Sequence, residues 1–237
     1  MIHPKTIFRI IGSLLLLLAG IFVLFGIASP FLEGNDLFGF LASALATTLA
    51  GLWCLIIGKG TKGDFSRRDS YITITSCWIA FALFGSLPYW LGGHIPSFTD
   101  AFFESMSGFT TTGSSIVPAV EELSHAALIW RSFTNWIGGM GVLVFVMAFV
   151  PLSGGNNLHI MKAESPGPSV SKLVPRIRTT ALILYLIYIV LTLAEFILLL
   201  CGGMNAFEAL CTWPPSPSCH LRNVFVYHAK RSFFLSG

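Results

Sequence analysis

The chain has 237 residues, of which 54% are hydrophobic and only 11% are charged, with a formal net charge of +3. Soluble domains carry roughly 25% charged residues, so this composition excludes an ordinary water-soluble globule and indicates an integral membrane protein. The positive charge does not indicate nucleic-acid binding, because the cationic residues gather beside apolar segments, where they set membrane topology.

Five apolar segments are long enough to cross a hydrocarbon core of about 30 Å, which takes about 20 helical residues. They cover residues 10–29, 37–58, 71–92, 126–150 and 179–201. The first follows Lys5 and Arg9, as in a secretory signal, but its apolar run is too long and a second apolar segment follows at once. We therefore expect a retained first helix and an all-α integral membrane fold, with five transmembrane helices in contact with membrane lipid.

Lysine and arginine mark three connections between these segments. They are Lys5 and Arg9 before the first span, Lys59, Lys62, Arg67 and Arg68 after the second, and Lys162, Lys172, Arg176 and Arg178 after the fourth. Because such residues near helix ends resist translocation, these connections and the N-terminus are predicted to be cytoplasmic. The connections at 30–36 and 93–124 are predicted to face outward, since they lack lysine and arginine and hold Glu33, Asp36, Asp100, Glu104, Glu121 and Glu122.

The sequence carries no pattern typical of an enzyme. The five cysteines and six histidines show no metal-ligand spacing, so the cysteines are interpreted as packing residues. GxSxG, HExxH and Walker sequences do not occur in the chain. We expect neither catalytic residues nor an organic cofactor.

The third and fourth spans are joined by a connection that contains the sequence FFESMSGFTTTGSSIV at residues 102–117. Residues 98–108 are apolar enough to be helical, but at 1.5 Å per residue this helix measures about 16 Å and does not cross a membrane. A short helix whose chain returns to the same side is typical of a re-entrant loop. An ordinary polar outer loop is the alternative interpretation.

Irregular backbone at membrane depth is tolerated where it lines a water-filled cavity, because unsatisfied peptide groups are costly in lipid. Potassium-selective filters use such backbone, with carbonyl oxygens that replace the water shell of the ion. Thr110, Thr111 and Thr112 would supply carbonyls, and Gly113 would permit a positive φ that turns a carbonyl inward. The stretch therefore predicts a potassium ion site.

The stretch FFESMSGFTTTGSSIV, followed by IWRSFTNWIGGMGVLVFVMAFVPL, resembles the first pore repeat of the Trk/Ktr/HKT superfamily of potassium transporters, most closely the bacterial TrkH-type membrane subunit. The resemblance extends over about residues 1–212. It implies four repeats around one pore. Each repeat consists of a helix, a pore helix and a second helix, and supplies one filter strand. It also implies that Thr111 and Thr112 carry the ion-coordinating carbonyls, with Thr110, Gly113 and Ser114 adjoining them.

The same resemblance implies potassium uptake across a bacterial inner membrane. The implied partners are a second copy of the membrane subunit and a cytosolic nucleotide-binding gating subunit of the TrkA type. The alternatives are a secondary transporter of another class, with broken helices, and a membrane scaffold that does not transport.

The chain divides into an N-terminal helix pair at 1–60, a first pore repeat at 70–152 and a cytoplasmic loop at 153–178. The beginning of a second repeat follows at 179–212, because NAFEALCTW from Asn205 matches DAFFESMSG from Asp100. The partner of Gly113 would then be Ser218, but the tail at 213–237 has no Thr-Gly pair and carries Pro214, Pro215 and Pro217. We interpret the tail as the result of a reading frame lost near Thr212, and a genuine divergent tail is the alternative. We expect that this chain alone does not conduct ions selectively.

Two further features lie inside predicted spans. Arg131 and Glu195 are at similar depths, so they either pair with each other or extend separately toward the outer interface. Gly138, Gly139 and Gly141 allow close approach of another segment, which is either the pore helix with its filter or an ordinary neighbouring helix.

Overall fold

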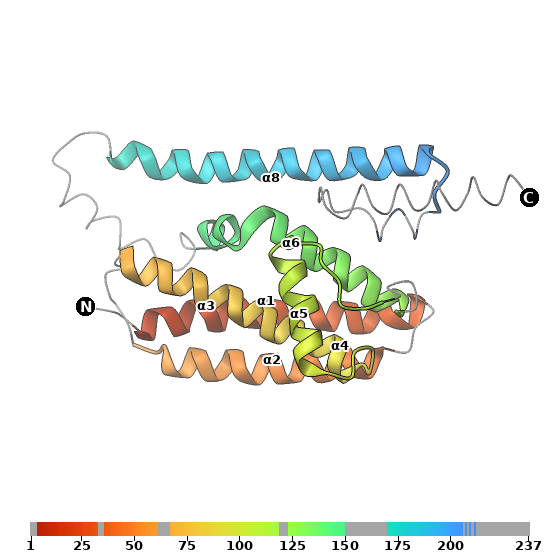
Figure 1. Ribbon diagram of the computed structural model, residues 1–237. Coiled ribbons are helices and arrows are strands. Elements are labelled where there is room, and N and C mark those ends of the chain that lie inside the picture. Colours follow the sequence, from red (N-terminus) through yellow and green to blue (C-terminus); the bar gives the residue numbers. More distant parts are fainter. Residues whose placement is uncertain are drawn as a thin grey trace, which may run out of the picture.

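The computed structural model describes residues 4–32, 36–60, 67–118, 123–149, 170–205, 207, 209 and 211. Within these residues the secondary structure is helical, with no strand, as the sequence predicts. Figure 1 shows the helices in chain order from red to blue. The predicted cytoplasmic loop up to residue 169 and the predicted tail at 213–237 lie outside the described residues.

The first half of the chain forms three long helical segments. The helices are α1 (Pro4–Ala28), continued by a 3-10 turn at Ser29–Leu32, then α2 (Leu37–Ile57), α3 (Arg67–Gly85) and the short α4 (Leu87–Leu91). Among the described residues, Pro4–Leu32, Leu37–Ile57 and Ile72–Leu91 are long and apolar enough to cross a membrane. These segments agree with the first three predicted spans.

The second half contains α5 (Phe98–Phe109), α6 (His125–Phe149) and α8 (Val170–Cys201). The predicted span at 126–150 is not one continuous helix, because Gly141 has φ 67° and ψ 134° inside α6. Glycine reaches this conformation without the steric penalty that a Cβ would impose, and α6 changes direction. Helix α8 begins at Val170, earlier than the predicted position 179, and Tyr185–Cys201 is its apolar stretch.

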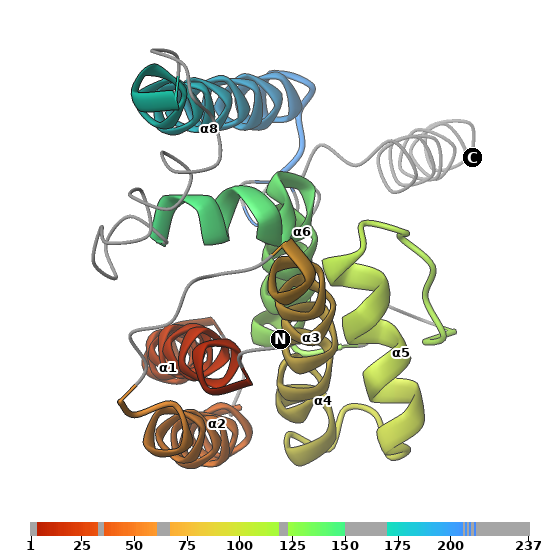
Figure 2. The same cartoon turned by 90° about the vertical axis from the view of Figure 1, so that its left-hand side faces the viewer.

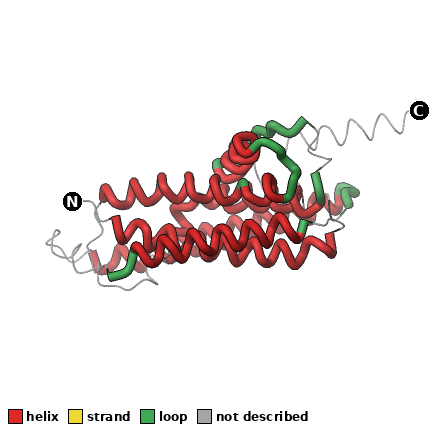
Figure 3. Tube along the Cα trace, turned by 90° about the horizontal axis from the view of Figure 1, so that it is seen from below, coloured by secondary structure: helices red, strands yellow, loops and turns green. Residues whose placement is uncertain are grey.

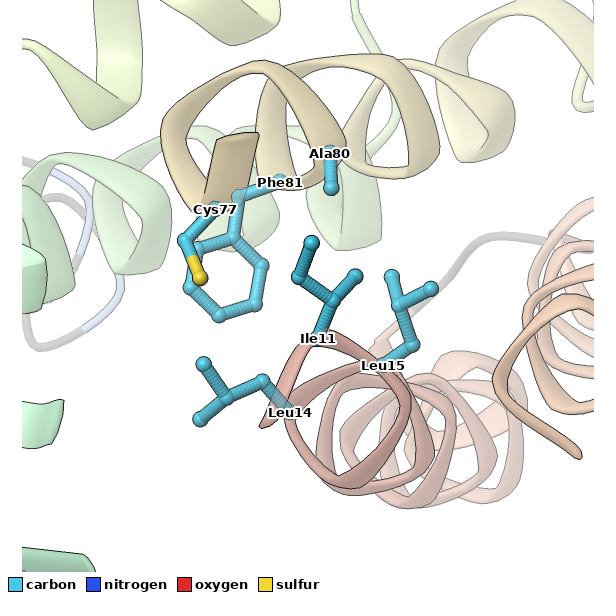
Figure 4. A pocket seen from close by; sticks show the side chains of 6 residues that line it. All are labelled: Ile11, Leu14, Leu15, Cys77, Ala80 and Phe81. Carbon is cyan, nitrogen blue, oxygen red and sulfur yellow. The ribbon is translucent and has the colours of Figure 1, made fainter. Parts of the chain in front are cut away.

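Helices α1 and α2 form a closely packed pair beside the rest of the bundle (Figure 2). Helix α1 also packs against α3 through apolar side chains: Ile11, Leu14 and Leu15 of α1 point toward Cys77, Ala80 and Phe81 of α3 (Figure 4). Such contacts hold membrane helices together by van der Waals packing, since lipid offers no hydrophobic driving force between them. The N-terminal pair is therefore joined directly to the helices that surround α5.

An aromatic cluster joins the helix pair to α5 and α6. Trp130 of α6 is fully buried, and its ring lies 5.0 Å from Phe22 and 5.4 Å from Phe25, both in α1. Its ring also lies 6.5 Å from Phe109, the last residue of α5. The Trp130 indole N–H donates to the carbonyl of Gly85 over 3.0 Å, so the buried polar atom of the cluster is satisfied.

Three loops meet at one end of the bundle. Asp36 lies just before α2, His94 follows α4, and Ser124 precedes α6. His94 Nε2 lies 2.9 Å from Asp36 Oδ1, and the Ser124 hydroxyl donates to Asp36 Oδ2. Most of the described loops gather at this end, away from the N-terminus (Figure 3).

These contacts show that both ends of the connection at 93–124 lie on the same side of the bundle. The chain leaves the bundle end at His94, forms the short α5 and returns to the same end at Ser124. The short helix and the return to one side agree with the sequence, and the depth of α5 in a membrane stays a prediction.

Candidate functional site

The site is built on α5. Ser97 has extended backbone angles and caps the helix, because its hydroxyl accepts a hydrogen bond from the amide of Asp100 over 3.4 Å. Asp100 lies in the first turn, where a negative charge favours the helix dipole. The helix runs to Phe109, one residue beyond the predicted position 108, so the predicted short helix is confirmed.

Two backbone hydrogen bonds cap the C-terminus of α5. The amide of Thr112 donates to the carbonyl of Ser107 over 3.0 Å, and that of Thr111 donates to Gly108 over 3.0 Å. This is the Schellman pattern, in which the left-handed position is usually glycine. Here the position is Thr111, with φ 56°. A β-branched residue is strained in this region by about 1–2 kcal/mol, and such strain is often found at functional sites.

Residues 110–114 then continue without regular secondary structure after the turn at Thr111. Gly113 has φ 71°, the positive value that the sequence predicts. Thr110, Thr112 and Ser114 are exposed, whereas Thr111 and Gly113 are half-buried. Within the described part of the chain, no hydrogen-bond donor reaches the carbonyl oxygens of Thr111, Thr112 or Gly113. These carbonyls remain available to an ion.

The end of α5 that adjoins these residues is electrostatically suited to a cation. A helix C-terminus carries a partial negative charge of roughly half an elementary charge, and residues 110–114 follow it directly. The hydroxyls of Thr110 and Thr112 lie 2.8 Å apart, and that of Thr110 also donates to the carbonyl of Met106 over 2.7 Å. The segment thus offers only oxygen ligands, which hard cations prefer.

Two side chains of α5 bind the backbone that returns from the site. The Ser107 hydroxyl donates to the carbonyl of Ser114 over 2.6 Å. One turn earlier on the same helix face, the Glu104 carboxylate accepts hydrogen bonds from the Ser115 hydroxyl at 3.0 Å and the Ile116 amide at 3.1 Å. Residues 114–116 therefore run back along α5.

Glu104 also binds Arg131 of α6. The Arg131 Nε donates to Glu104 Oε1 over 2.6 Å, and the two side chains are 18% and 1% exposed. From the sequence, Glu104 is only one of six acidic residues in the outward connections, and Glu195 is the ion-pair partner considered for Arg131. The sequence therefore does not predict the Glu104–Arg131 pair. The alternative in which Arg131 extends separately is wrong, because its guanidinium binds Glu104. The pairing of Arg131 with Glu195 stays a prediction.

The glycines of α6 receive α5. A Cβ built on Gly138 would collide with the carbonyl of Phe109, and one on Gly108 would collide with the Thr134 hydroxyl of α6. Of the two interpretations of the glycine group, Gly138 fits the first in that it receives the end of α5. Gly139 instead receives the Tyr188 hydroxyl of α8. Gly141 produces the break in α6.

The described residues contain no group of three or more His, Cys, Asp or Glu side chains placed to hold a metal ion. The Asp36, His94 and Ser124 side chains bind one another where the loops meet. Backbone and hydroxyl oxygens at 110–114 are therefore the candidate ligands.

Comparison with known proteins gives one family. The family model of the cation transport protein TrkH matches residues 43–209. The Trk system potassium uptake protein TrkH of Escherichia coli strain K12 is 33% identical over 211 residues, which cover 88% of this chain and 44% of that protein. The TrkH of Halomonas elongata is 35% identical over 209 residues, covering 87% of this chain and 43% of that protein.

A solved structure gives the same result. The crystal structure of the potassium transporter TrkH from Vibrio parahaemolyticus matches with a TM-score of 0.68 and 29% identity, covering 87% of this chain and 41% of that chain. This chain therefore spans less than half the length of the relatives that it matches.

Proposed function

The chain belongs to the TrkH family of cation transport proteins, and from this we propose that it supplies one filter segment to a pathway for potassium uptake. The carrying observation is the non-helical segment at 110–114, in which Gly113 has a positive φ and carbonyl oxygens lack donors within the described chain. Thr111 and Thr112 present their carbonyls to a dehydrated potassium ion, with Thr110, Gly113 and Ser114 adjoining.

The driving force needs no catalytic group. A membrane potential contributes about 2.3 kcal/mol per elementary charge per 100 mV, which draws a cation toward the cytoplasm. In this proposal the protein is located in a bacterial inner membrane. Several of its helices cross the membrane, and its N-terminus lies in the cytoplasm.

A filter that strips water from an ion needs ligands on all sides. This chain supplies one segment. In the whole protein, the further segments belong to the part that corresponds to the unmatched part of the relatives. The proposed partners of the whole protein are a second membrane subunit and a cytosolic nucleotide-binding subunit of the TrkA type. The chain alone is expected not to conduct selectively.

A chimera tests the proposal. The matched 211 residues replace the corresponding part of Escherichia coli TrkH, and the chimera is expressed in a strain that lacks its own potassium uptake systems. We expect growth on low potassium and uptake of rubidium as a potassium tracer, with neither in cells that express this chain alone. A chimera that reaches the membrane at normal levels but takes up neither ion would contradict the proposal.

A further inference from the structure

The carboxylate of Glu104 connects α5 to two other parts of the site. It projects from α5, accepts hydrogen bonds from Ser115 and Ile116 of the returning segment, and binds Arg131 of α6. Ser115 Oγ lies within reach of both carboxylate oxygens, at 3.2 Å from Oε1 and 3.0 Å from Oε2. Both oxygens are therefore engaged by donors.

The buried carboxylate of Glu104 is surrounded by a positive charge and by hydrogen-bond donors. Glu104 is 2% exposed, and a buried carboxylate is stable as an anion only where a positive charge and hydrogen-bond donors compensate for the lost water. Arg131 supplies the charge, and Ser115 and Ile116 supply the donors. Charge-assisted hydrogen bonds of this kind are stronger than neutral ones.

The returning segment that Glu104 binds lies next to the proposed ligands. Ser115 and Ile116 follow Ser114 directly, and Ser107 holds the carbonyl of Ser114 from the next turn of α5. At the other end, the Schellman pair fixes Thr111 and Thr112. Residues 110–114 are thus attached to α5 on both sides, and Glu104 is the charged attachment.

We propose that Glu104, oriented by Arg131, is a positioning residue that sets the spacing of the filter carbonyls and so the preference for potassium over sodium. Sodium is smaller and requires closer oxygens, so discrimination depends on a backbone that does not move inward. Release of residues 115–116 would allow that movement. The inference rests on the proposed function.

The first measurement needs no transport. Hydrogen–deuterium exchange is followed in the 237-residue chain in lipid nanodiscs, for the wild type and Glu104→Gln, which keeps the size and removes the charge. We expect exchange at 110–117 to become about tenfold faster or more, since hydrogen bonds to a charged group are lost, with α1 and α2 unchanged. Asp100→Asn, which removes a carboxylate from the first turn of α5, is the matched control and should leave 110–117 unchanged.

If Glu104→Gln disturbs α1 and α2 as well, Ser115→Ala replaces it. This variant removes the hydroxyl that donates to Glu104 and leaves the ion pair intact, but it also removes the acceptor of the Val117 amide. We then expect faster exchange at 110–116, and exchange at Val117 is not counted. Unchanged exchange at 110–116 in a folded Glu104→Gln or Ser115→Ala variant overturns the inference.

The second measurement is selectivity in the chimera described above. Glu104→Gln should lower the ratio of rubidium to sodium uptake about tenfold while total cation uptake persists, a pattern that simple loss of folded protein does not produce. A wild-type ratio in this variant overturns the inference and leaves the proposed function standing. A wild-type chimera without uptake contradicts the proposed function, and the exchange data alone then decide whether Glu104 positions the segment.

Discussion

The hydroxyl of Ser107 donates a 2.6 Å hydrogen bond to the carbonyl oxygen of Ser114, so α5 holds the segment that follows it. Ser107→Ala should lower the free energy of unfolding by about 0.5–1.5 kcal/mol, the net value of one hydrogen bond. Denaturant unfolding of the purified chain in detergent measures this change. Ser13→Ala is the control, because Ser13 makes a similar bond to the Arg9 carbonyl on an exposed face of α1. An equal effect in both variants would argue against the role of Ser107.

The contact between Gly138 and the end of α5 has a sharp steric consequence. A methyl group at Gly138 meets the Phe109 carbonyl, so Gly138→Ala should destabilise the fold by about 1–3 kcal/mol through overpacking. A Cβ on Gly20 of α1 meets nothing within 4 Å, so Gly20→Ala should be neutral or stabilising by up to about 1 kcal/mol. Thermal unfolding in detergent compares the two. Equal stability of both variants would mean that α5 does not pack closely on α6.

Thr111 occupies the left-handed position that Schellman turns normally give to glycine. Thr111→Gly should therefore raise stability by up to about 1 kcal/mol, because relief of strain outweighs the greater entropy of an unfolded glycine. Gly113→Ala should lower stability, since φ 71° opposes a Cβ. Unfolding free energies of both variants test these opposite signs, and a destabilised Thr111→Gly variant would show that Thr111 is not strained.

The Asp36–His94 contact links the N-terminal helix pair to the connection that contains α5. A double-mutant cycle of Asp36→Ala and His94→Ala should give a coupling free energy of about 0.5–3 kcal/mol, the range for residues in contact. Asp36→Ala combined with Ser13→Ala should instead be additive within about 0.5 kcal/mol, because the Ser13 hydroxyl bonds to the Arg9 carbonyl within its own helix and shares no partner with Asp36 among the described residues. Additivity in the first pair would mean that the contact adds nothing to stability.

The elements that the sequence predicts well are those with a local cause. The bounds of α5 follow from an apolar run between the Ser97 cap and the threonines, and the positive φ of Gly113 follows from the absence of a Cβ. The first three spans follow from length and hydropathy. Each of these signals is contained within about 20 neighbouring residues.

The features that the sequence does not predict are of two kinds. Some depend on contacts between residues far apart in the chain, and others depend on which of several similar glycines takes which structural role. Glu104 lies 27 positions from Arg131, and His94 lies 58 positions from Asp36, so no local pattern pairs them. Gly138 and Gly141 look alike in the sequence, yet one receives α5 and the other interrupts α6. The spacing of Glu104 and Ser107 on one face of α5 was the available signal for the attachment of the returning segment.

The most direct test of the account asks whether residues 110–114 line the path of the ion. In the chimera, Thr112→Cys is treated from outside with a positively charged thiol reagent during rubidium uptake, with and without potassium. Phe31→Cys serves as the control, because Phe31 is exposed in the connection predicted to face outward. We predict that the reagent stops uptake through Thr112→Cys, that potassium slows this inhibition, and that uptake through labelled Phe31→Cys is unaffected. Full uptake through Thr112→Cys after proven labelling would contradict a cation site at these residues.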